Sequence, residues 1–242
     1  MENVTLNNVF RARQTIIEML EQRGYTIPYG IKYISMDRFA IMYELYINDD
    51  SKKIEGRNEI LDISISNKDI YGNFIRTYVS WIKKEKYIND SKQNFKKNLN
   101  PNENDNLIIV IMDIDNIPSE DTYLYKENNN VSIFSLKLIQ MNITKHALVP
   151  KFTVLTLEEK DKLITSLNIT PDKLPLMYRF HVINGTELQL SDPIARFYGM
   201  RGGDIVKIER NSITSGHYCA YRYIVGENTT FLGDNIKPNS TN

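Results

Sequence analysis

Residues 192–223, DPIARFYGMRGGDIVKIERNSITSGHYCAYRY, constrain the fold more than any other stretch of this chain. Ser191 or Asp192 can cap a short helix, and Pro193 suits the first helical position because its missing N–H would be unpaired there anyway. Gly199 is the natural residue for a left-handed stop just past the helix end. Alternating apolar residues then predict two strands, 204–210 and 217–225. The stretch therefore predicts a helix followed by a β-hairpin, and nothing in it has a catalytic pattern.

The order of residues in this stretch is similar to one known family. It contains D-P-x-A-R-x-Y-G, a G-D turn, V-K-I-x-R and T-x-G-x-Y-x-x-Y-R. Together these resemble the C-terminal "assembly" domain of the fifth-largest subunit shared by the eukaryotic nuclear RNA polymerases, a subunit that has a short archaeal homologue. Residues 11–27, RARQTIIEMLEQRGYTI, resemble the opening helix of the same family, R-x-R-x-T-x-x-E-M-L-x-x-R-G-Y. Residues 142–150, NITKHALVP, resemble its link N-I-T-x-H-x-L-V-P, but Phe152 stands where the family has a second histidine.

Hydrophobic periodicity predicts the remaining elements of the first 144 residues. Val9, Ala12 and Ile16 have helical spacing, with Asn7 or Asn8 as the expected cap and a stop at Gly24. The other expected elements are a helix after Ser35 carrying Phe39, Met42 and Tyr43; a half-buried strand over 61–66; a helix over 75–82; a buried central strand over 107–112; and one or two strands within 131–134 and 136–143.

These elements predict an α/β layer domain over residues 1–144. The resemblance implies that this is the family's "jaw", a three-layer fold related to restriction endonucleases. Residues 145–226 are expected to form a small α+β assembly domain, in which Thr156 and Glu159 supply a capping box for the next helix. The polar tail, 227–242, is expected either to be disordered or to order only on a partner.

One segment departs from the family pattern between Pro175 and Asp192. Alternating apolar residues flank Asn184-Gly185, a strong turn signal, so an extra β-hairpin is expected at about 177–190, with 177–183 paired to 186–190. This departure and Phe152, together with the Asn-rich composition, favour a large DNA virus over a cellular host as the source.

Composition excludes several classes of protein. Thirty basic residues balance thirty acidic ones, so no global field attracts nucleic acid or a membrane surface. A single cysteine excludes an internal disulfide, and three histidines give no zinc-finger spacing. No apolar run approaches the roughly 20 residues needed to span a bilayer, and the start lacks a signal-peptide core. We therefore expect a soluble intracellular protein with no membrane partner.

Candidate catalytic and metal-binding residues are few. Asp113 and Asp115 follow the central strand, but a nuclease of this fold would need an Asp/Glu-x-Lys on the next strand, where the chain has only Ser135-x-Lys137. Strand-end solvated acids are the favoured interpretation, with a stand-alone nuclease and a free DNA-binding module as alternatives. His181, His217 and Cys219 could be metal ligands on adjacent strands, although packing or surface polarity is favoured. No catalytic residue, metal or cofactor is expected.

Two regions are candidate DNA contacts. The basic run 76–97, which includes Lys83 and Lys84, is interpreted first as a solvated helix face and second as a DNA-facing patch. Pro118-Ser119 resembles the loop by which the family's jaw approaches downstream DNA, although two acidic residues follow it.

The assembly domain carries the candidate subunit interface. Arg196 and Arg222 are open to two interpretations, pairing inside the domain or contact with another subunit. Five aromatic residues exceed what so small a domain can bury and favour an interface: Phe197, Tyr198, Tyr218, Tyr221 and Tyr223. The expected interface residues are His146, Pro150, Asp192, Pro193, Arg196, Tyr198, Gly199, Tyr221 and Arg222.

The resemblance implies a non-catalytic subunit of a multisubunit DNA-directed RNA polymerase, present in one copy per complex. Its partners would be the largest polymerase subunit, the rest of the core and the downstream duplex DNA. Its expected location is the nucleus if the source is cellular, and the virion and host cytoplasm if it is viral.

Overall fold

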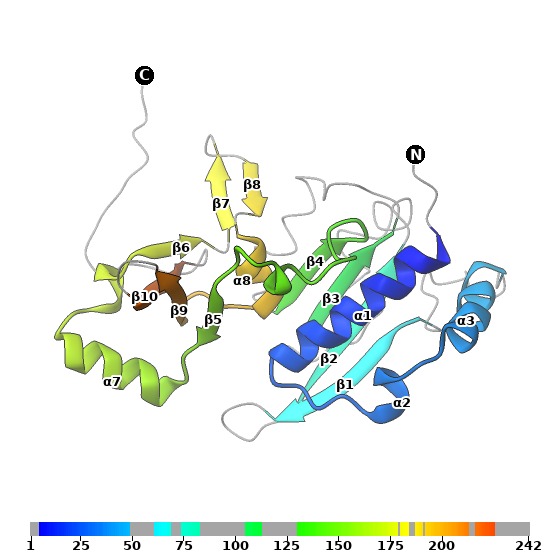
Figure 1. The fold of residues 1–242 in the computed structure, drawn as a ribbon, viewed down its shortest axis with the longest axis horizontal. Coiled ribbons are helices and arrows are strands. Elements are labelled where there is room, and N and C mark those ends of the chain that lie inside the picture. The colour runs from blue at the N-terminus through cyan, green and yellow to red at the C-terminus, as the bar shows by residue number, and fades with distance from the viewer. Residues whose placement is uncertain are drawn as a thin grey trace.

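The computed structural model describes residues 5–48, 61–68, 74–82, 105–112, 130–178, 180–183, 187–190, 192–212 and 216–225. They form a mixed α/β structure with two four-stranded sheets and a separate two-stranded sheet (Figure 1). No helix among these residues is long and apolar enough to cross a membrane.

The first sheet has the order β1-β2-β3-β4. Its strands are β1 (Ile63–Lys68), β2 (Phe74–Ile82), β3 (Asn106–Ile111) and β4 (Val131–Ser135). β1 and β2 are antiparallel, and β2, β3 and β4 run parallel. The predicted strands at 61–66 and 107–112 are confirmed, and the second of them is central and buried as expected.

The helix predicted over residues 75–82 is wrong, because these residues form strand β2. Thr77, Val79 and Trp81 are buried at a spacing of two residues, which is the strand period, and Ser80 on the opposite face is buried as well. The same short segment also matches helical spacing, and periodicity alone cannot separate the two structures in a short apolar run. Its β-branched and aromatic residues suit a pleated, half-buried surface.

Two helices and one short turn of helix surround this sheet: α1 (Leu6–Gln22), α2 (Tyr29–Lys32) and α3 (Met36–Asn48). The cap of α1 is Thr5, whose side chain accepts a hydrogen bond from the Asn8 N–H at 3.4 Å, so the predicted Asn7 or Asn8 cap is wrong. Helix α1 begins earlier than predicted and ends before Gly24, where φ is +86°. Ser35 accepts a hydrogen bond from the Arg38 N–H at the start of α3, as predicted.

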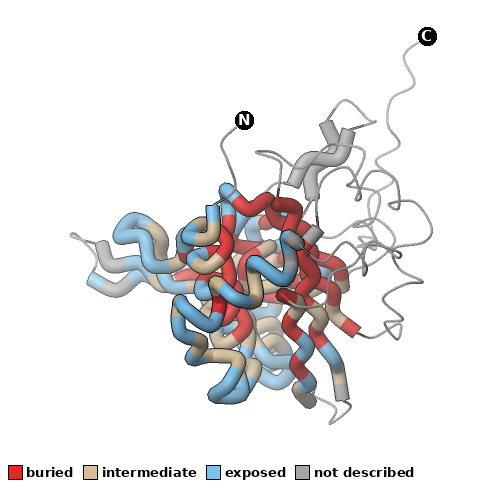
Figure 2. Tube along the Cα trace, turned by 90° about the vertical axis from the view of Figure 1, so that its right-hand side faces the viewer, coloured by how far each residue is buried: buried red, intermediate tan, exposed pale blue. Residues whose placement is uncertain are grey.

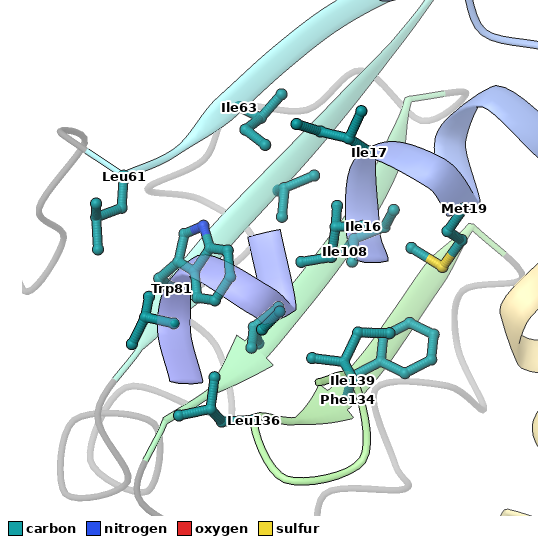
Figure 3. Close-up of a cluster of buried hydrophobic side chains, with 14 of the residues drawn as sticks. Ile16, Ile17, Met19, Leu61, Ile63, Trp81, Ile108, Phe134, Leu136 and Ile139 are labelled. Carbon is teal, nitrogen blue, oxygen red and sulfur yellow. The ribbon is translucent and has the colours of Figure 1, made fainter. Parts of the chain in front are cut away.

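Helix α1 lies along one face of the first sheet and closes the larger hydrophobic cluster. Figure 3 shows Ile16, Ile17 and Met19 of the helix in one cluster with side chains of the sheet, among them Ile108 and Trp81, and all five of these side chains are buried. Buried residues lie mostly in the interior of the described part of the molecule, and exposed ones lie toward its outside (Figure 2). Burial of apolar side chains on this scale is the main favourable term in folding.

Of the one or two strands predicted within 131–134 and 136–143, one forms: β4 ends at Ser135, and the chain turns there. The N–H groups of Leu138 and Ile139 donate to the Ser135 carbonyl oxygen, which closes the turn. Leu136 and Ile139 are buried in the turn because they fill the end of the cluster (Figure 3). Their apolar character therefore reflects packing and not a strand.

The second sheet has the order β5-β9-β10-β6. Its strands are β5 (Lys151–Val154), β9 (Ile205–Ser212), β10 (Gly216–Val225) and β6 (Leu176–Tyr178), and the helical elements of this half are η3 (Ile143–Lys145), α7 (Leu157–Leu167), η4 (Pro171–Lys173) and α8 (Pro193–Tyr198). The β9–β10 hairpin confirms the two strands predicted after α8. Thr156 and Glu159 form the predicted capping box of α7. A second, smaller hydrophobic cluster contains Val206, Ile208 and Ile224.

The extra hairpin is confirmed in part. β7 (Phe180–Ile183) pairs antiparallel with β8 (Glu187–Leu190) and stands apart from both larger sheets (Figure 1). The predicted first strand is too long, because Met177 belongs to β6 and pairs in parallel with Ile224 of β10. Met177 is buried in the smaller cluster, which holds it in the second sheet, and the hairpin begins only after β6, at Phe180.

Candidate functional site

Helix α8 lies between the two sheets and carries several of the predicted interface residues (Figure 1). Asp192 caps it by accepting hydrogen bonds at Oδ1 from the N–H groups of Ile194 at 2.8 Å and Ala195 at 3.2 Å. Pro193 occupies the first helical position, and Gly199 ends the helix with φ of 63°. The predicted start and stop of this helix are confirmed.

Arg23, at the end of α1, binds the C-terminal end of α8. Its Nε donates to the Phe197 carbonyl oxygen at 2.8 Å, and its Nη2 donates to the Arg196 carbonyl oxygen at 2.7 Å. The last carbonyl groups of a helix have no partner inside the helix, and a cation is favoured at this end. One half-buried guanidinium therefore binds two carbonyl groups at the end of α8, and it joins α1 to α8.

Gly199 allows this close approach. A Cβ atom at this position would lie 2.9 Å from both Cζ and Nη1 of Arg23, closer than real Cβ contacts come. The φ of +63° is also one that other residues adopt only with strain. The glycine therefore serves both as the helix stop and as the space into which Arg23 packs.

The two aromatic residues at the end of α8 belong to different surroundings. Phe197 is 2% exposed and lies in the larger cluster with α1 and the first sheet. The prediction that Phe197 is one of the aromatic residues left on the surface is therefore wrong. Tyr198 packs against both clusters, with its ring centroid 6.5 Å from that of Phe152, and burial raises the pKa of its phenol. Tyr218 is exposed, as the interface prediction expects.

The link between the sheets is fastened to the same helix, α1. Asn142 Nδ2 donates to Glu18 Oε2 at 2.8 Å, Lys145 Nζ donates to Glu18 Oε1 at 2.6 Å, and Gln22 Nε2 donates to Thr144 Oγ1 at 3.1 Å. Burial opposes ionisation of Glu18, but the hydrogen bonds from Lys145 and Asn142 outweigh it and hold the pKa of this carboxyl below its ordinary value. The three motifs that carried the resemblance thus meet around α1 and α8.

The two arginines left open by the sequence have different contacts. Arg222 Nη1 donates to the Leu176 carbonyl oxygen at 3.0 Å, which is a contact inside the second sheet. The Arg196 guanidinium lies 5.8 Å from the centroid of the Phe134 ring in β4. Within the described chain its Nε and Nη1 are buried and have no hydrogen-bond partner. Arg196 therefore adds an ion–ring contact between α8 and the first sheet. Tyr221 is half-buried in β10.

His146 and Pro150 lie in the link, apart from α8. His146 is exposed, and its Nδ1 accepts a hydrogen bond from the Leu148 N–H at 3.2 Å. Pro150 is half-buried and lines a groove of about 690 Å³. The predicted interface residues therefore form two groups, one around α8 and one along the link.

The described structure does not bring together the residues that a metal site or a nuclease site would need. Cys219 is exposed in β10, whereas His181 belongs to β7 of a different sheet, so these residues are not on adjacent strands. No group of three or more potential metal ligands occurs among the residues that the structure describes. Lys137 lies in the turn after β4 and not on the strand, while Asp113 and Asp115 lie outside the described residues.

The candidate DNA contacts Lys83, Lys84, Pro118 and Ser119 also lie outside the described residues. Arg76, which begins the basic run, lies in β2, so the expected helix face does not exist at that end of the run. Its backbone N–H donates to Asp105 Oδ1 at 3.0 Å.

Sequence analysis missed Arg23, Glu18 and Gln22 as contact residues. They lie in the last turns of α1 or just past its end, but their partners are more than 100 positions away in the chain. The only available signal was the motif of the opening helix itself, in which these positions had no assigned role.

Comparison with known proteins gives consistent results. A sequence model of the family described as RNA polymerase Rpb5, C-terminal domain, matches residues 141–224. The chain is 26% identical over 223 residues to DNA-directed RNA polymerases I, II, and III subunit RPABC1 of Caenorhabditis elegans, which is 90% of this chain and 95% of that protein. It is 26% identical over 226 residues to DNA-directed RNA polymerase subunit 5-like protein 1 of Arabidopsis thaliana, 91% of this chain and 97% of that one.

A shorter relative is more similar. DNA-directed RNA polymerase subunit Rpo5 of Sulfurisphaera tokodaii is 39% identical over 87 residues, which is 36% of this chain and 90% of that protein. The match is close in length to the stretch 141–224 that the family model covers. A protein of about this size therefore exists as a chain of its own.

Proposed function

This chain belongs to the family of RNA polymerase subunits that includes Rpb5, RPABC1 and Rpo5, and we propose that it is a non-catalytic subunit of a multisubunit DNA-directed RNA polymerase. The observation that carries the proposal is the similarity to RPABC1 along 90% of the chain. The contacts that join the three family motifs around α1 and α8 also support it, because they give these motifs a common structural role.

The proposed roles of its two parts are distinct. Residues 145–226 dock on the largest polymerase subunit, and residues 1–144 flank the downstream DNA as a jaw. The division is supported by the first four-stranded sheet, which ends at Ser135, by the second, which begins at Lys151, and by the smaller hydrophobic cluster, whose buried members all lie within residues 145–226. The jaw role is supported by the resemblance of residues 11–27 to the family's opening helix.

The source and location follow from the departures in sequence. A large DNA virus is proposed because Phe152 and the β7–β8 hairpin depart from the family pattern. The protein then lies in the virion and the host cytoplasm, whereas a cellular source places it in the nucleus. Locating the gene on a host chromosome would overturn the viral proposal.

The test of the function is purification from the native source with an affinity tag on this chain. Co-elution with two very large subunits, together with template-dependent RNA synthesis by the eluate, is the expected result. Emergence of the chain alone, with no RNA synthesis, would overturn the proposal. If the chain does co-elute with the polymerase, crosslinking of residues 83 and 84 to downstream DNA in a stalled polymerase tests the jaw role, and a crosslink is the expected result.

A further inference from the structure

The segment that connects the two four-stranded sheets, residues 136–150, is held to the rest of the fold along its length. At its start Leu136 is buried in the larger cluster, and near its end Val149 packs against the smaller cluster. Between these ends Asn142 Nδ2 donates to Glu18 Oε2 of α1 at 2.8 Å. A hinge lies where few contacts cross and absorbs large changes in backbone angles. The connecting segment does not meet this description.

Helix α8 belongs to both hydrophobic clusters. Phe197 is one of the buried residues of the larger cluster, whereas Ile194 and Ala195 are buried in the smaller one. Ile143 and Tyr198 are partly buried against both clusters. Because the clusters share these residues, neither sheet can separate from α8 without exposing apolar surface to water.

A separate chain of hydrogen bonds joins the segment after α8 to the first sheet. Arg201 Nη2 donates to Asn106 Oδ1 at 3.1 Å, at the start of β3. Asn106 Nδ2 donates to the Tyr25 hydroxyl oxygen at 2.9 Å, and that oxygen also accepts a hydrogen bond from Thr77 Oγ1 in β2 at 2.8 Å. The first sheet is therefore bound at a place other than the Arg23 contact. Rotation of one sheet about either contact would break the other.

We propose that the two sheets form one rigid and cooperative unit, in which α1 and α8 transmit a change of stability from either sheet to the other. The inference goes beyond the proposed function, because two parts with distinct roles then move together. The position of residues 151–225 fixes the position of the first sheet. Coupling between two parts is reciprocal, so a change in either sheet is felt by the other.

The chain contains one natural probe for each sheet, and the test uses the full chain. Trp81, its only tryptophan, is 2% exposed in β2, so its fluorescence reports unfolding of the first sheet. Cys219, its only cysteine, is exposed in β10 and takes a thiol-reactive fluorophore, which reports unfolding of the second sheet. Both probes give the same urea midpoint, because a cooperative unit unfolds in one step.

Two mild core variants separate coupling from a coincidence of midpoints. Ile63→Val changes the larger cluster at a position that is 3% exposed, and Ile224→Val changes the smaller cluster at a position that is fully buried. Each variant lowers the midpoints of both probes together, by about 0.5 M urea. Ser64→Ala, at an exposed position of β1, is the matched control and leaves both midpoints unchanged. A fall in the midpoint of only the sheet that carries the variant overturns the inference.

Spin labels on Cys219 and on a second cysteine introduced by Ser64→Cys measure the native arrangement, since both positions are exposed. Double electron–electron resonance gives one narrow distribution of distances for the wild-type background and for Arg11→Ala. The distribution is broader for Arg23→Ala, which loses the hydrogen bonds to α8. Two populations in the wild-type background, or no difference between that background and Arg23→Ala, overturn the inference. The test needs no other polymerase subunit, so its outcome is separate from that of the co-elution experiment.

Discussion

The Nε of Arg23, just past the end of α1, donates a 2.8 Å hydrogen bond to the carbonyl oxygen of Phe197, 174 positions later in the chain. The same guanidinium bonds the Arg196 carbonyl oxygen, and Gly199 leaves room for it. Phe197 then places its ring among the residues that α1 covers. The end of one helix thus caps the end of another, and the two sheets are joined through this contact.

Replacing Arg23 with alanine should destabilise the protein by about 2–3 kcal/mol, because hydrogen bonds from a charged donor contribute about 1.5–3 kcal/mol and two carbonyl groups lose their partner. Urea unfolding measures the change. Arg11→Ala, in the same helix at an exposed position, is the control and should change stability by less than about 0.5 kcal/mol. Equal effects of the two variants would contradict the role of Arg23.

Replacing Gly199 with alanine should cost more than the same change at Gly24. Both glycines have positive φ, +63° and +86°, so both variants place alanine in a strained conformation that costs about 1 kcal/mol. Only at Gly199 does the new Cβ meet Arg23, at 2.9 Å, so that arginine must move and weaken its two hydrogen bonds. Thermal unfolding of both variants separates backbone strain from this contact. A Gly24 variant as unstable as the Gly199 variant would contradict the cost assigned to the contact with Arg23.

Thr156→Ala should destabilise helix α7 by about 1 kcal/mol, the usual cost of losing an N-cap side chain. In the capping box the Thr156 Oγ1 accepts from the Glu159 N–H at 3.3 Å, and Glu159 Oε2 accepts from the Thr156 N–H at 2.8 Å. Thr165→Ala, at an exposed position inside the same helix, is the control and should be neutral or slightly stabilising. Circular dichroism during unfolding reports both.

Glu18→Gln should make stability less dependent on acid pH. The pKa of Glu18 is lowered in the folded protein from its ordinary 4.5, so the ionised carboxylate stabilises the fold above that pH. This contribution is lost as pH falls from 4.5 through the lower folded value. The difference in unfolding free energy between wild type and Glu18→Gln should therefore be full at neutral pH and shrink below pH 4.5. A constant difference across this range would rule out the contribution of Lys145 and Asn142.

Local signals predicted part of the fold correctly. The cap at Asp192, the stop at Gly199 and the capping box of Thr156 all depend on contacts within a few residues, so the sequence contains both partners. The β9–β10 hairpin follows from alternation and turn residues in the same way. The prediction failed at 75–82, where the pairing with β3 decides the structure, and it left the number of strands open at 131–143, where the filling of the cluster decides that there is one.

The sequence by itself determined the family, the caps of α7 and α8 and most of the strands. Only the tertiary structure decided that the opening helix, the link and α8 meet, and that Phe197 is buried while Leu148 is exposed. Arg23 and Phe197 show the reason: each is ordinary in its own segment, and their hydrogen bond exists only after the chain between them has folded. Contacts between distant segments depend on packing geometry, which local periodicity and propensity do not contain.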